Sequence, residues 1–215
     1  MSRRIMALSA VLALALALLV GLAVRKSASG PEATGVSIGG PFQLVDTSGR
    51  TVDQDLLKGK WSVVFFGFTY CPDICPTTLF EMAQVEPLLG TRADRVQTVF
   101  ISVDPGRDTV AQVKAYVSND AFPKRLIGLT GSAAQVDAAA KAYRVFYQKV
   151  GEGPDYQVNH GAYSVLMNPK GQFTCVLAYE LTPEQTAAKI QAAMKLGDSA
   201  TSCTADIERK SRIDP

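Results

Sequence analysis

Histidine is nearly absent from this sequence, since His160 is the only one among 215 residues. A metal site that needs several imidazole ligands is therefore excluded. The chain also lacks an excess of charge of either sign. Residues 1–26 contain four basic and no acidic side chains, so the remainder has 18 basic and 20 acidic residues and a net charge of −2. That balance gives no electrostatic reason to expect a nucleic-acid partner.

The overall composition is that of a folded protein. Apolar residues make up 47% of the chain and charged residues 20%, which excludes an intrinsically disordered chain. A length of 215 residues suffices for one domain with a substantial hydrophobic core and is short for two large ones.

One long apolar run lies near the N-terminus. Residues 5–24 contain no charged side chain, and a helix of that length spans the ~30 Å hydrocarbon core of a bilayer. Arg3 and Arg4 precede the run, so the positive-inside rule predicts an N-terminus in the cytoplasm. We expect residues 1–26 to be a single-pass anchor in the inner (plasma) membrane, with the domain in the periplasm of a bacterium. A signal peptide cleaved near residues 27–29 is the alternative.

Composition divides the rest of the chain into three parts. Residues 27–41 are small, polar and rich in glycine and proline, which is typical of a tether. Residues 42–196 alternate short apolar runs with amphipathic stretches, which predicts one folded domain. Residues 197–215 are polar and show no periodicity, so we expect a frayed tail.

Strands and helices alternate along the predicted domain. Continuous apolar runs at 61–66 and 96–103 predict buried central strands, and a shorter run at 126–129 predicts a third. Apolar residues near helical spacing predict a helix over 77–89. Three further helix starts are marked by a hydroxyl residue three positions before a glutamine, at Thr109, Ser132 and Thr182.

Antiparallel hairpins flank this alternation at both ends. The first is predicted between residues 42–45 and 51–52, and the second joins 162–167 to 173–179 through a turn. A C-terminal hairpin followed by a helix is what the thioredoxin-like fold uses. We therefore predict an α/β domain of the thioredoxin-like fold with an N-terminal β-hairpin, preceded by one transmembrane helix.

Cysteine is scarce, with four residues, and two of them lie close together. Cys71 and Cys75 stand between a predicted strand and a predicted helix, in the segment Cys-Pro-Asp-Ile-Cys-Pro. A helix N-terminus stabilises a thiolate, which is the form that attacks disulfides and binds metals. Residues four apart lie on one face of a helical turn, so the pair can close a disulfide or hold one ion. Two inert structural cysteines are the alternative.

A third metal ligand would have to come from His160. It precedes the predicted strand at 162–167, whose start lies near the cysteine helix in a thioredoxin-like topology. Thiolates select Cu(I) and Zn²⁺, and imidazole suits both copper states. Cys71, Cys75 and His160 therefore predict a site for one metal ion, with copper and zinc both compatible with these ligands. A surface or capping histidine and a zinc-stabilised structural domain are the alternatives.

These residues resemble the copper-site segment of the Sco (SenC) proteins. The resemblance is carried by Gly67–Leu79, by Ser102–Thr109 with its Asp-Pro-x-Arg-Asp pattern, and by Val158–His160, and it extends over about residues 42–194. It implies that Cys71, Cys75 and His160 bind one copper ion per chain, as Cu(I) or Cu(II). It also implies that the protein helps to assemble the dinuclear copper centre of cytochrome c oxidase subunit II.

The function implied by the resemblance is that of a copper metallochaperone, which binds and delivers the metal without turnover. Its partners would be cytochrome c oxidase subunit II or a related copper acceptor, and an upstream copper donor or thiol reductant. The alternative is a thiol–disulfide reductase, in which Cys71 and Cys75 form a redox disulfide and act on a partner's cysteines. A dedicated reductase does not need His160, so this residue favours the copper function.

Four other residues of the matching segments are candidates for supporting roles. Asp104 and Arg107 are expected to surround the metal ligands or to form a docking face, and Asp108 to support the start of the next helix. Asn159 stands where the family usually carries an aspartate. If that aspartate tunes Cu(II) affinity by acting on the neighbouring histidine, this chain should bind Cu(II) more weakly.

The remaining two cysteines are Cys175, inside a predicted strand, and Cys203, in the polar tail. A buried cysteine in a strand is most simply an inert thiol. An oxidising compartment also permits a disulfide between the two, which would pin the tail to the domain. The sequence leaves both interpretations open.

Overall fold

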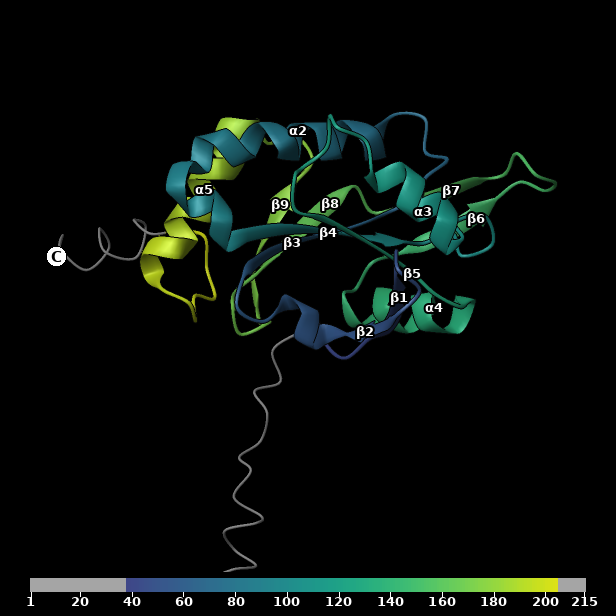
Figure 1. Cartoon of the computed structure of the whole chain (residues 1–215), viewed down its shortest axis with the longest axis horizontal. Helices are drawn as coiled ribbons and strands as arrows, with labels where there is room; N and C mark the ends of the chain where they lie inside the picture. The colour runs from purple at the N-terminus through teal and green to yellow at the C-terminus, as the bar shows by residue number, and fades with distance from the viewer. Residues whose placement is uncertain (1–37, 205–215) are drawn as a thin grey trace, which may run out of the picture. The chain divides into compact units, whose positions relative to one another are not determined.

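The computed structural model describes residues 38–204, and within that range a seven-stranded sheet forms the centre of the domain (Figure 1). The strand order is β2-β1-β5-β4-β3-β8-β9, and β6 and β7 pair in a small sheet of their own. The strands are β1 (Gln43–Asp46), β2 (Thr51–Asp53), β3 (Trp61–Gly67), β4 (Val96–Ser102), β5 (Leu126–Thr130), β6 (Tyr147–Val150), β7 (Gln157–His160), β8 (Tyr163–Met167) and β9 (Phe173–Ala178).

Helices cover both faces of the central sheet, with α2, α3 and α5 on one side and α4 on the other (Figure 1). The Phe100 ring of β4 packs on Tyr116 of α3, and the Phe66 ring of β3 packs on Tyr143 at the end of α4, each at 5.4 Å between ring centroids. The helices are α2 (Ile74–Leu89), α3 (Val110–Val117), α4 (Ala133–Ala142) and α5 (Pro183–Leu196), with short 3-10 helices η1 (Gln54–Leu57) and η2 (Gly90–Arg95).

The two central strands are parallel neighbours, and their register places the functional loops. Every residue of β3 and of β4 is buried, as the continuous apolar runs predicted. Gly67 at the end of β3 lies opposite Ser102 at the end of β4. Because the carboxyl ends of parallel strands meet at one edge of a sheet, the cysteine loop and the loop that contains Asp104 are adjacent.

The predicted helix starts are present, with one difference in detail. Ser132 and Thr182 each form a complete capping box, in which side chain and backbone bond reciprocally. Thr109 accepts a hydrogen bond from the backbone of Gln112. The amide side chain of Gln112, however, donates to the Thr69 hydroxyl at 3.3 Å instead of returning to the cap. That helix start is thereby tied to the cysteine loop.

One hairpin, β6–β7, was not predicted from the sequence. Most of its residues are exposed and each strand has only four residues, so its apolar positions are too few to give a clear alternation. Residues 151–156 form the connection, and the first five of them (Gly-Glu-Gly-Pro-Asp) are a turn signal that could have revealed it. His160 therefore ends a strand of its own, whereas it was expected to lie in the approach to β8.

The N-terminal predictions fall only partly within the described residues. The predicted membrane anchor at 5–24 lies outside them, and between residues 38 and 204 no helix has the length and apolarity needed to cross a bilayer. Residues 38–41, the end of the predicted tether, lie on the fold. Ile38 packs against the core, and the Gly39 amide donates to the Ala142 carbonyl oxygen at 2.9 Å.

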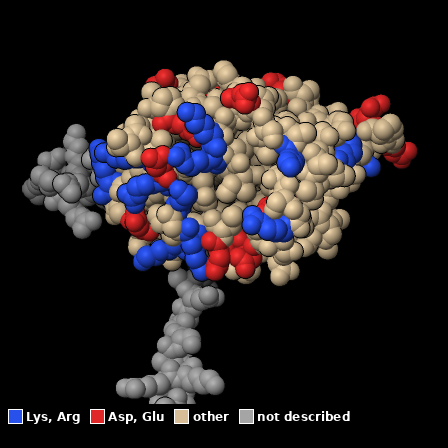
Figure 2. Space-filling view, viewed as in Figure 1, with Lys and Arg blue, Asp and Glu red and all other residues tan. Residues whose placement is uncertain are grey.

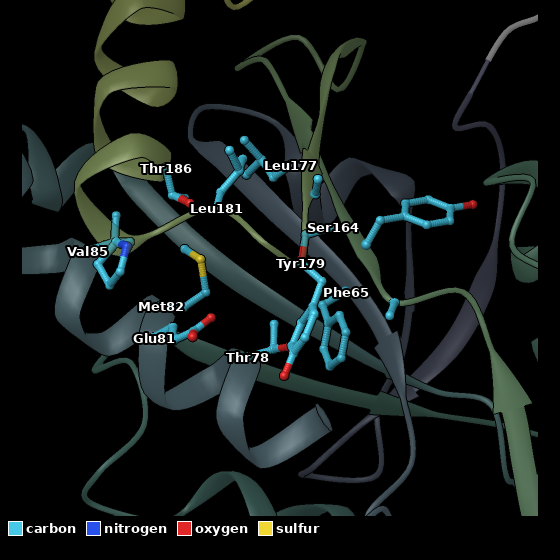
Figure 3. Close-up of a pocket in the computed structure, with 14 residues that line it drawn as sticks. Phe65, Thr78, Glu81, Met82, Val85, Ser164, Leu177, Tyr179, Leu181 and Thr186 are labelled. Atoms are coloured by element: carbon cyan, nitrogen blue, oxygen red, sulfur yellow. The ribbon is translucent and has the colours of Figure 1, made fainter. Parts of the chain in front are cut away.

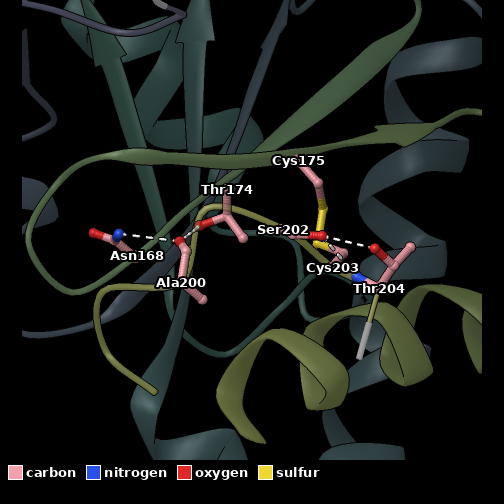
Figure 4. The surroundings of a disulfide bond; sticks show 7 residues. All are labelled: Asn168, Thr174, Cys175, Ala200, Ser202, Cys203 and Thr204. Atoms are coloured by element: carbon pink, nitrogen blue, oxygen red, sulfur yellow. Dashed lines mark hydrogen bonds between the residues drawn. A yellow bond between two sulfur atoms is a disulfide. The ribbon is translucent and has the colours of Figure 1, made fainter. Parts of the chain in front are cut away.

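The C-terminal segment is attached as far as Thr204, so the expectation that residues 197–204 fray is wrong. A disulfide joins Cys203 to Cys175 of β9 (Figure 4). The Ala200 carbonyl oxygen accepts hydrogen bonds from the Thr174 hydroxyl at 2.9 Å and from the buried Asn168 side-chain amide at 3.2 Å. The disulfide and these hydrogen bonds hold the segment in place, although its sequence shows no helical periodicity.

Charged side chains of both signs are interspersed on the face shown in Figure 2. Several charged side chains of the described residues pair, including Lys58 with Asp55 and Arg95 with Asp198, both at 2.6 Å. Exposed ion pairs of this kind contribute about 0–1 kcal/mol each to stability. The fold is therefore held by its buried apolar layers and not by its surface charges.

Candidate metal centre

The first two residues of the site come from the loop after β3 and the first turn of α2. Cys71 lies in the loop and is half-buried, and Cys75 lies in the helix and is fully buried. The Cys75 backbone amide points to the Cys71 sulfur at 3.4 Å. This is the expected arrangement for a helix N-terminus that stabilises a thiolate.

The two thiols differ in acidity. Hydrogen bonding from the Cys75 thiol, with further contributions from His160 and two backbone amides, lowers the pKa of Cys71 to about 4. The same contact raises the pKa of Cys75, because its proton is shared with the Cys71 thiolate and its side chain is buried. In the metal-free dithiol, Cys71 is therefore the nucleophile and Cys75 the proton donor.

A glycine at the end of β3 makes room for the buried thiol. A Cβ atom placed on Gly67 would lie 2.8 Å from the Cys75 sulfur and 3.0 Å from ring atoms of Phe65 and Phe100. Such contacts are far closer than ordinary packing permits. The absence of a side chain at Gly67 thus sets the depth of Cys75, a role that the sequence motif alone did not reveal.

The third residue, His160, reaches the cysteines from the end of β7. Its Nε2 atom lies 3.5 Å from the Cys75 sulfur, and its Nδ1 atom lies 3.1 Å from the Gly161 carbonyl oxygen. A carbonyl oxygen only accepts hydrogen bonds, so Nδ1 carries a hydrogen, and Nε2 is the nitrogen that faces the sulfurs. The ring of Phe68 packs edge-on against the imidazole at 5.8 Å between centroids.

The three ligand atoms are close enough to hold a single ion. The two sulfurs and an imidazole nitrogen all lie within 4.8 Å of one another. Two sulfurs bonded to one metal at ~2.3 Å can be at most ~4.6 Å apart, so binding needs at most a slight contraction. Two soft thiolates with one imidazole suit copper in either oxidation state. Cys71, Cys75 and His160 are thus brought together as the sequence analysis predicted.

Asp108 fixes the cysteine loop from the neighbouring strand end. Its carboxylate accepts hydrogen bonds from the Thr69 hydroxyl at 2.6 Å, the Thr69 amide at 3.0 Å and the Ser102 hydroxyl at 2.6 Å. The side chain is completely buried, and burial raises its pKa. The sequence analysis assigned Asp108 to the start of the next helix. In the structure its side chain instead joins the two loops that meet at the sheet edge.

The other candidate residues do not contact the ligand atoms. Asp104 and Arg107 form an ion pair at 2.5 Å beside the site, and both contact Tyr156, which the sequence analysis did not single out. Asn159 is exposed. Because successive side chains of a strand point to opposite faces, Asn159 faces away from the side of β7 that presents His160.

A pocket beside the site is too small to be an alternative functional centre. It lies between α2, the start of α5 and the β8–β9 pair, and its polar lining residues include Thr78, Glu81 and Tyr179 (Figure 3). Its cavity volume is about 30 Å³, which leaves room for only a few water molecules. Cys71, Cys75 and His160 are the group of potential metal ligands found in the described part of the chain.

The fold and site together define a thioredoxin-like α/β protein with a dithiol–imidazole metal centre at the carboxyl edge of its sheet. A family model described as SCO1/SenC matches residues 30–195. The chain belongs to the SCO1/SenC family, as the resemblance of its motifs predicted.

Individual relatives agree with this assignment. The chain is 45% identical over 146 residues to "Protein SCO1 homolog 1, mitochondrial" of Arabidopsis thaliana, a match that covers 67% of this chain and 43% of that relative's length. The solved structure of Bradyrhizobium japonicum ScoI with copper bound matches with 44% identity and a TM-score of 0.65, covering 72% of this chain and 98% of that one.

A more distant solved relative belongs to a family of cytochrome c oxidase assembly proteins. BsSco, described as a member of the Sco family of cytochrome c oxidase assembly proteins with a disulfide switch, matches with 27% identity and a TM-score of 0.60. The match covers 76% of this chain and 95% of that one. The predicted thioredoxin-like fold of the domain is thereby confirmed by solved relatives.

Proposed function

We propose that this protein binds one copper ion, as Cu(I) or Cu(II), through Cys71, Cys75 and His160. The convergence of two thiol sulfurs and one imidazole nitrogen within 4.8 Å is the observation that carries the proposal. The thiolates supply soft ligands that retain Cu(I), and the imidazole adds the nitrogen that stabilises Cu(II). The copper bound to the Bradyrhizobium japonicum relative supports the choice of metal.

The copper is best understood as cargo for another protein. Cys71 and His160 are half-exposed, whereas Cys75 is buried. A partner's thiolates can therefore displace Cys71 and His160 before Cys75, so that the metal is never released into solution. We propose that the acceptor is cytochrome c oxidase subunit II or a related protein, in which the copper joins a dinuclear centre. The membership of BsSco in a family of cytochrome c oxidase assembly proteins supports this choice.

The alternative function is reduction of the partner's cysteines by the metal-free dithiol. The lowered pKa of Cys71 favours it, because a thiolate at neutral pH attacks a disulfide directly. Cys75 then resolves the mixed disulfide. This reaction leaves His160 without a direct part, so the histidine distinguishes the two functions.

We further propose that the domain works at a membrane surface, held by residues 5–24 with the N-terminus in the cytoplasm and the domain in the periplasm. The support is the uncharged apolar run and the arginines that precede it. Retention in the membrane fraction after alkaline extraction is the expected result, and release by that treatment would contradict it.

Transfer of copper to an acceptor tests the proposed delivery. The copper-loaded chain is mixed with the copper-free soluble domain of cytochrome c oxidase subunit II, and the absorption of the dinuclear centre is followed. We expect the centre to form with the wild-type chain and not with Cys71→Ser. If the wild-type chain fails to deliver copper but restores free thiols to an oxidised acceptor, the reductase function replaces the proposed one.

The histidine separates the two functions in a second measurement. His160→Ala should weaken Cu(II) binding more than Cu(I) binding, because two thiolates can hold Cu(I) alone. The same variant should reduce an oxidised acceptor about as well as the wild type. Equal losses of affinity for both copper states would contradict the role assigned to the imidazole.

A further inference from the structure

The hairpin that presents His160 has little support of its own. β6 and β7 pair only with each other and are not part of the central sheet. Most of their side chains are exposed, with Val158 the buried exception. An isolated two-stranded hairpin is at best marginally stable in water. The position of His160 relative to the cysteines therefore depends on what holds this hairpin against the domain.

Val158 packs into the core, and a group of side chains at the turn end of the hairpin supplies a second hold. The Arg107 guanidinium lies over the Tyr156 ring at 3.6 Å and donates to the Pro154 carbonyl oxygen at 3.1 Å. The Tyr156 hydroxyl donates to Asp104, which also accepts from Arg107 at 2.5 Å. The loop after β4 thus places a cation on the Tyr156 ring and a carboxylate on its hydroxyl, while Lys149 of β6 lies over the same ring at 3.8 Å from within the hairpin. We call Asp104, Arg107 and Tyr156 the hairpin clamp.

The hairpin clamp is continuous with the cysteine loop. The Arg107 Cζ atom lies 4.8 Å from the ring centroid of Tyr70 and 5.8 Å from that of Phe68. Both aromatic residues belong to the segment just before Cys71. Asp108, in the same loop as the clamp, bonds the adjacent Thr69. One loop therefore braces both the segment that carries Cys71 and the hairpin that carries His160.

The geometry of the loop is matched to this contact. Gly106 lies between the two clamp residues of the loop, and a Cβ atom placed on it would lie 3.3 Å from the Tyr156 hydroxyl oxygen. The lack of a side chain at this position lets the tyrosine approach the carboxylate. The Asp-Pro-Gly-Arg segment is thereby shaped to receive one hydroxyl from the hairpin.

We propose that Tyr156 is a positioning residue for the metal centre, which acts through the hairpin clamp to hold His160 at bonding distance from the sulfurs. This inference rests on the proposed copper function and extends it to residues that do not touch the ion. Residues that orient a ligand without touching the metal commonly change affinity by about 10–100-fold. The clamp should matter for Cu(II), which needs the imidazole, more than for Cu(I).

A double-mutant cycle on the whole chain tests this proposal. Tyr156→Leu removes the ring and the hydroxyl, and we expect it to lower Cu(II) affinity by about tenfold when His160 is present. In the His160→Ala background the same change should leave Cu(II) affinity unaltered. Tyr156→Phe, which keeps the ring on Arg107 and loses only the bond to Asp104, should have a smaller effect. Glu152→Gln, an exposed change in the turn of the same hairpin, is the matched control and should have none.

A second readout does not depend on copper. In metal-free protein, Tyr156→Leu should accelerate hydrogen exchange of the β6–β7 amides while the central strands keep their protection. Equal losses of Cu(II) affinity with and without His160, or unchanged exchange in the hairpin, would overturn the proposal. If the wild-type chain bound no copper, the copper function would fail, whereas hairpin exchange would still decide whether the clamp fixes His160.

Discussion

A methyl group added at Gly67 should damage the fold and the metal centre together. The new Cβ atom would lie 2.8 Å from the Cys75 sulfur and 3.0 Å from ring atoms of Phe65 and Phe100. Ordinary contacts between carbon atoms are ~3.5–4.0 Å, so every neighbour must retreat by roughly half an ångström or more. All three neighbours are at most 1% exposed, so none can move into solvent.

The expected cost follows from this crowding. Overpacking a well-filled core by one methyl group costs about 1–3 kcal/mol of unfolding free energy. For a domain of this size that is a decrease of about 2–12 °C in the melting temperature. Because Cys75 is one of the displaced groups, Gly67→Ala should also weaken copper binding, whereas a purely structural overpacking elsewhere in the core would not.

Calorimetry of the metal-free protein and a copper competition titration measure the two effects. Gly40→Ala is the matched control, since a Cβ atom there meets only the Ala142 side chain at an acceptable 3.4 Å. The control should melt close to the wild type and keep its copper affinity. The reasoning would be refuted if Gly67→Ala melted at the same temperature as Gly40→Ala and bound copper equally well.

Three further predictions address the cysteines and the strand residue before the histidine. Because the pKa of Cys71 is lowered to about 4, iodoacetamide should alkylate Cys71 at a nearly constant rate between about pH 6 and 8. An ordinary thiol would react about 100-fold faster at pH 8 than at pH 6. Mass spectrometry should find Cys75 unmodified, and an alkylation rate that rose tenfold per pH unit would contradict the assignment. Cys203→Ser opens a disulfide that spans 28 residues and should lower the unfolding free energy by about 3–4 kcal/mol, as measured by urea denaturation without reductant; an unchanged midpoint would disprove that the disulfide stabilises the domain. Asn159→Asp places a charge on an exposed side chain, so at physiological salt it should change Cu(II) affinity by about twofold or less; a tenfold gain would show that the carboxylate acts directly on the ligands.

Much of the fold was predictable because its local signals agree with its packing. β3 is buried along its whole length, and its continuous apolar run reads as a central strand. Ser132 and Thr182 mark helix starts because a capping box is a local interaction visible in four residues. The β6–β7 hairpin was not predicted because its short, mostly exposed strands give no clear alternation of apolar residues, and only its turn residues indicate a hairpin.

The residues of the metal centre likewise fall into those predicted from the sequence and those found only in the structure. Cys71, Cys75 and His160 were predicted because their chemistry is rare and their placement follows from the strand order. The role of Gly67 depends on atoms that meet across the β3–α2 junction, and that of Tyr156 on a bond to Asp104 across 52 positions. Such contacts leave no trace in sequence spacing, so the residues that adjust the metal centre became visible only in three dimensions.

Metal analysis of the reduced 215-residue chain after copper loading tests the central claim most directly. The proposed centre predicts one copper per chain and, for Cu(II), a visible thiolate-to-metal absorption band. Both should be lost in a Cys71→Ser/Cys75→Ser variant that remains folded. A wild-type chain that retained no copper, or a double variant that retained as much copper as the wild type, would contradict the assignment of the site.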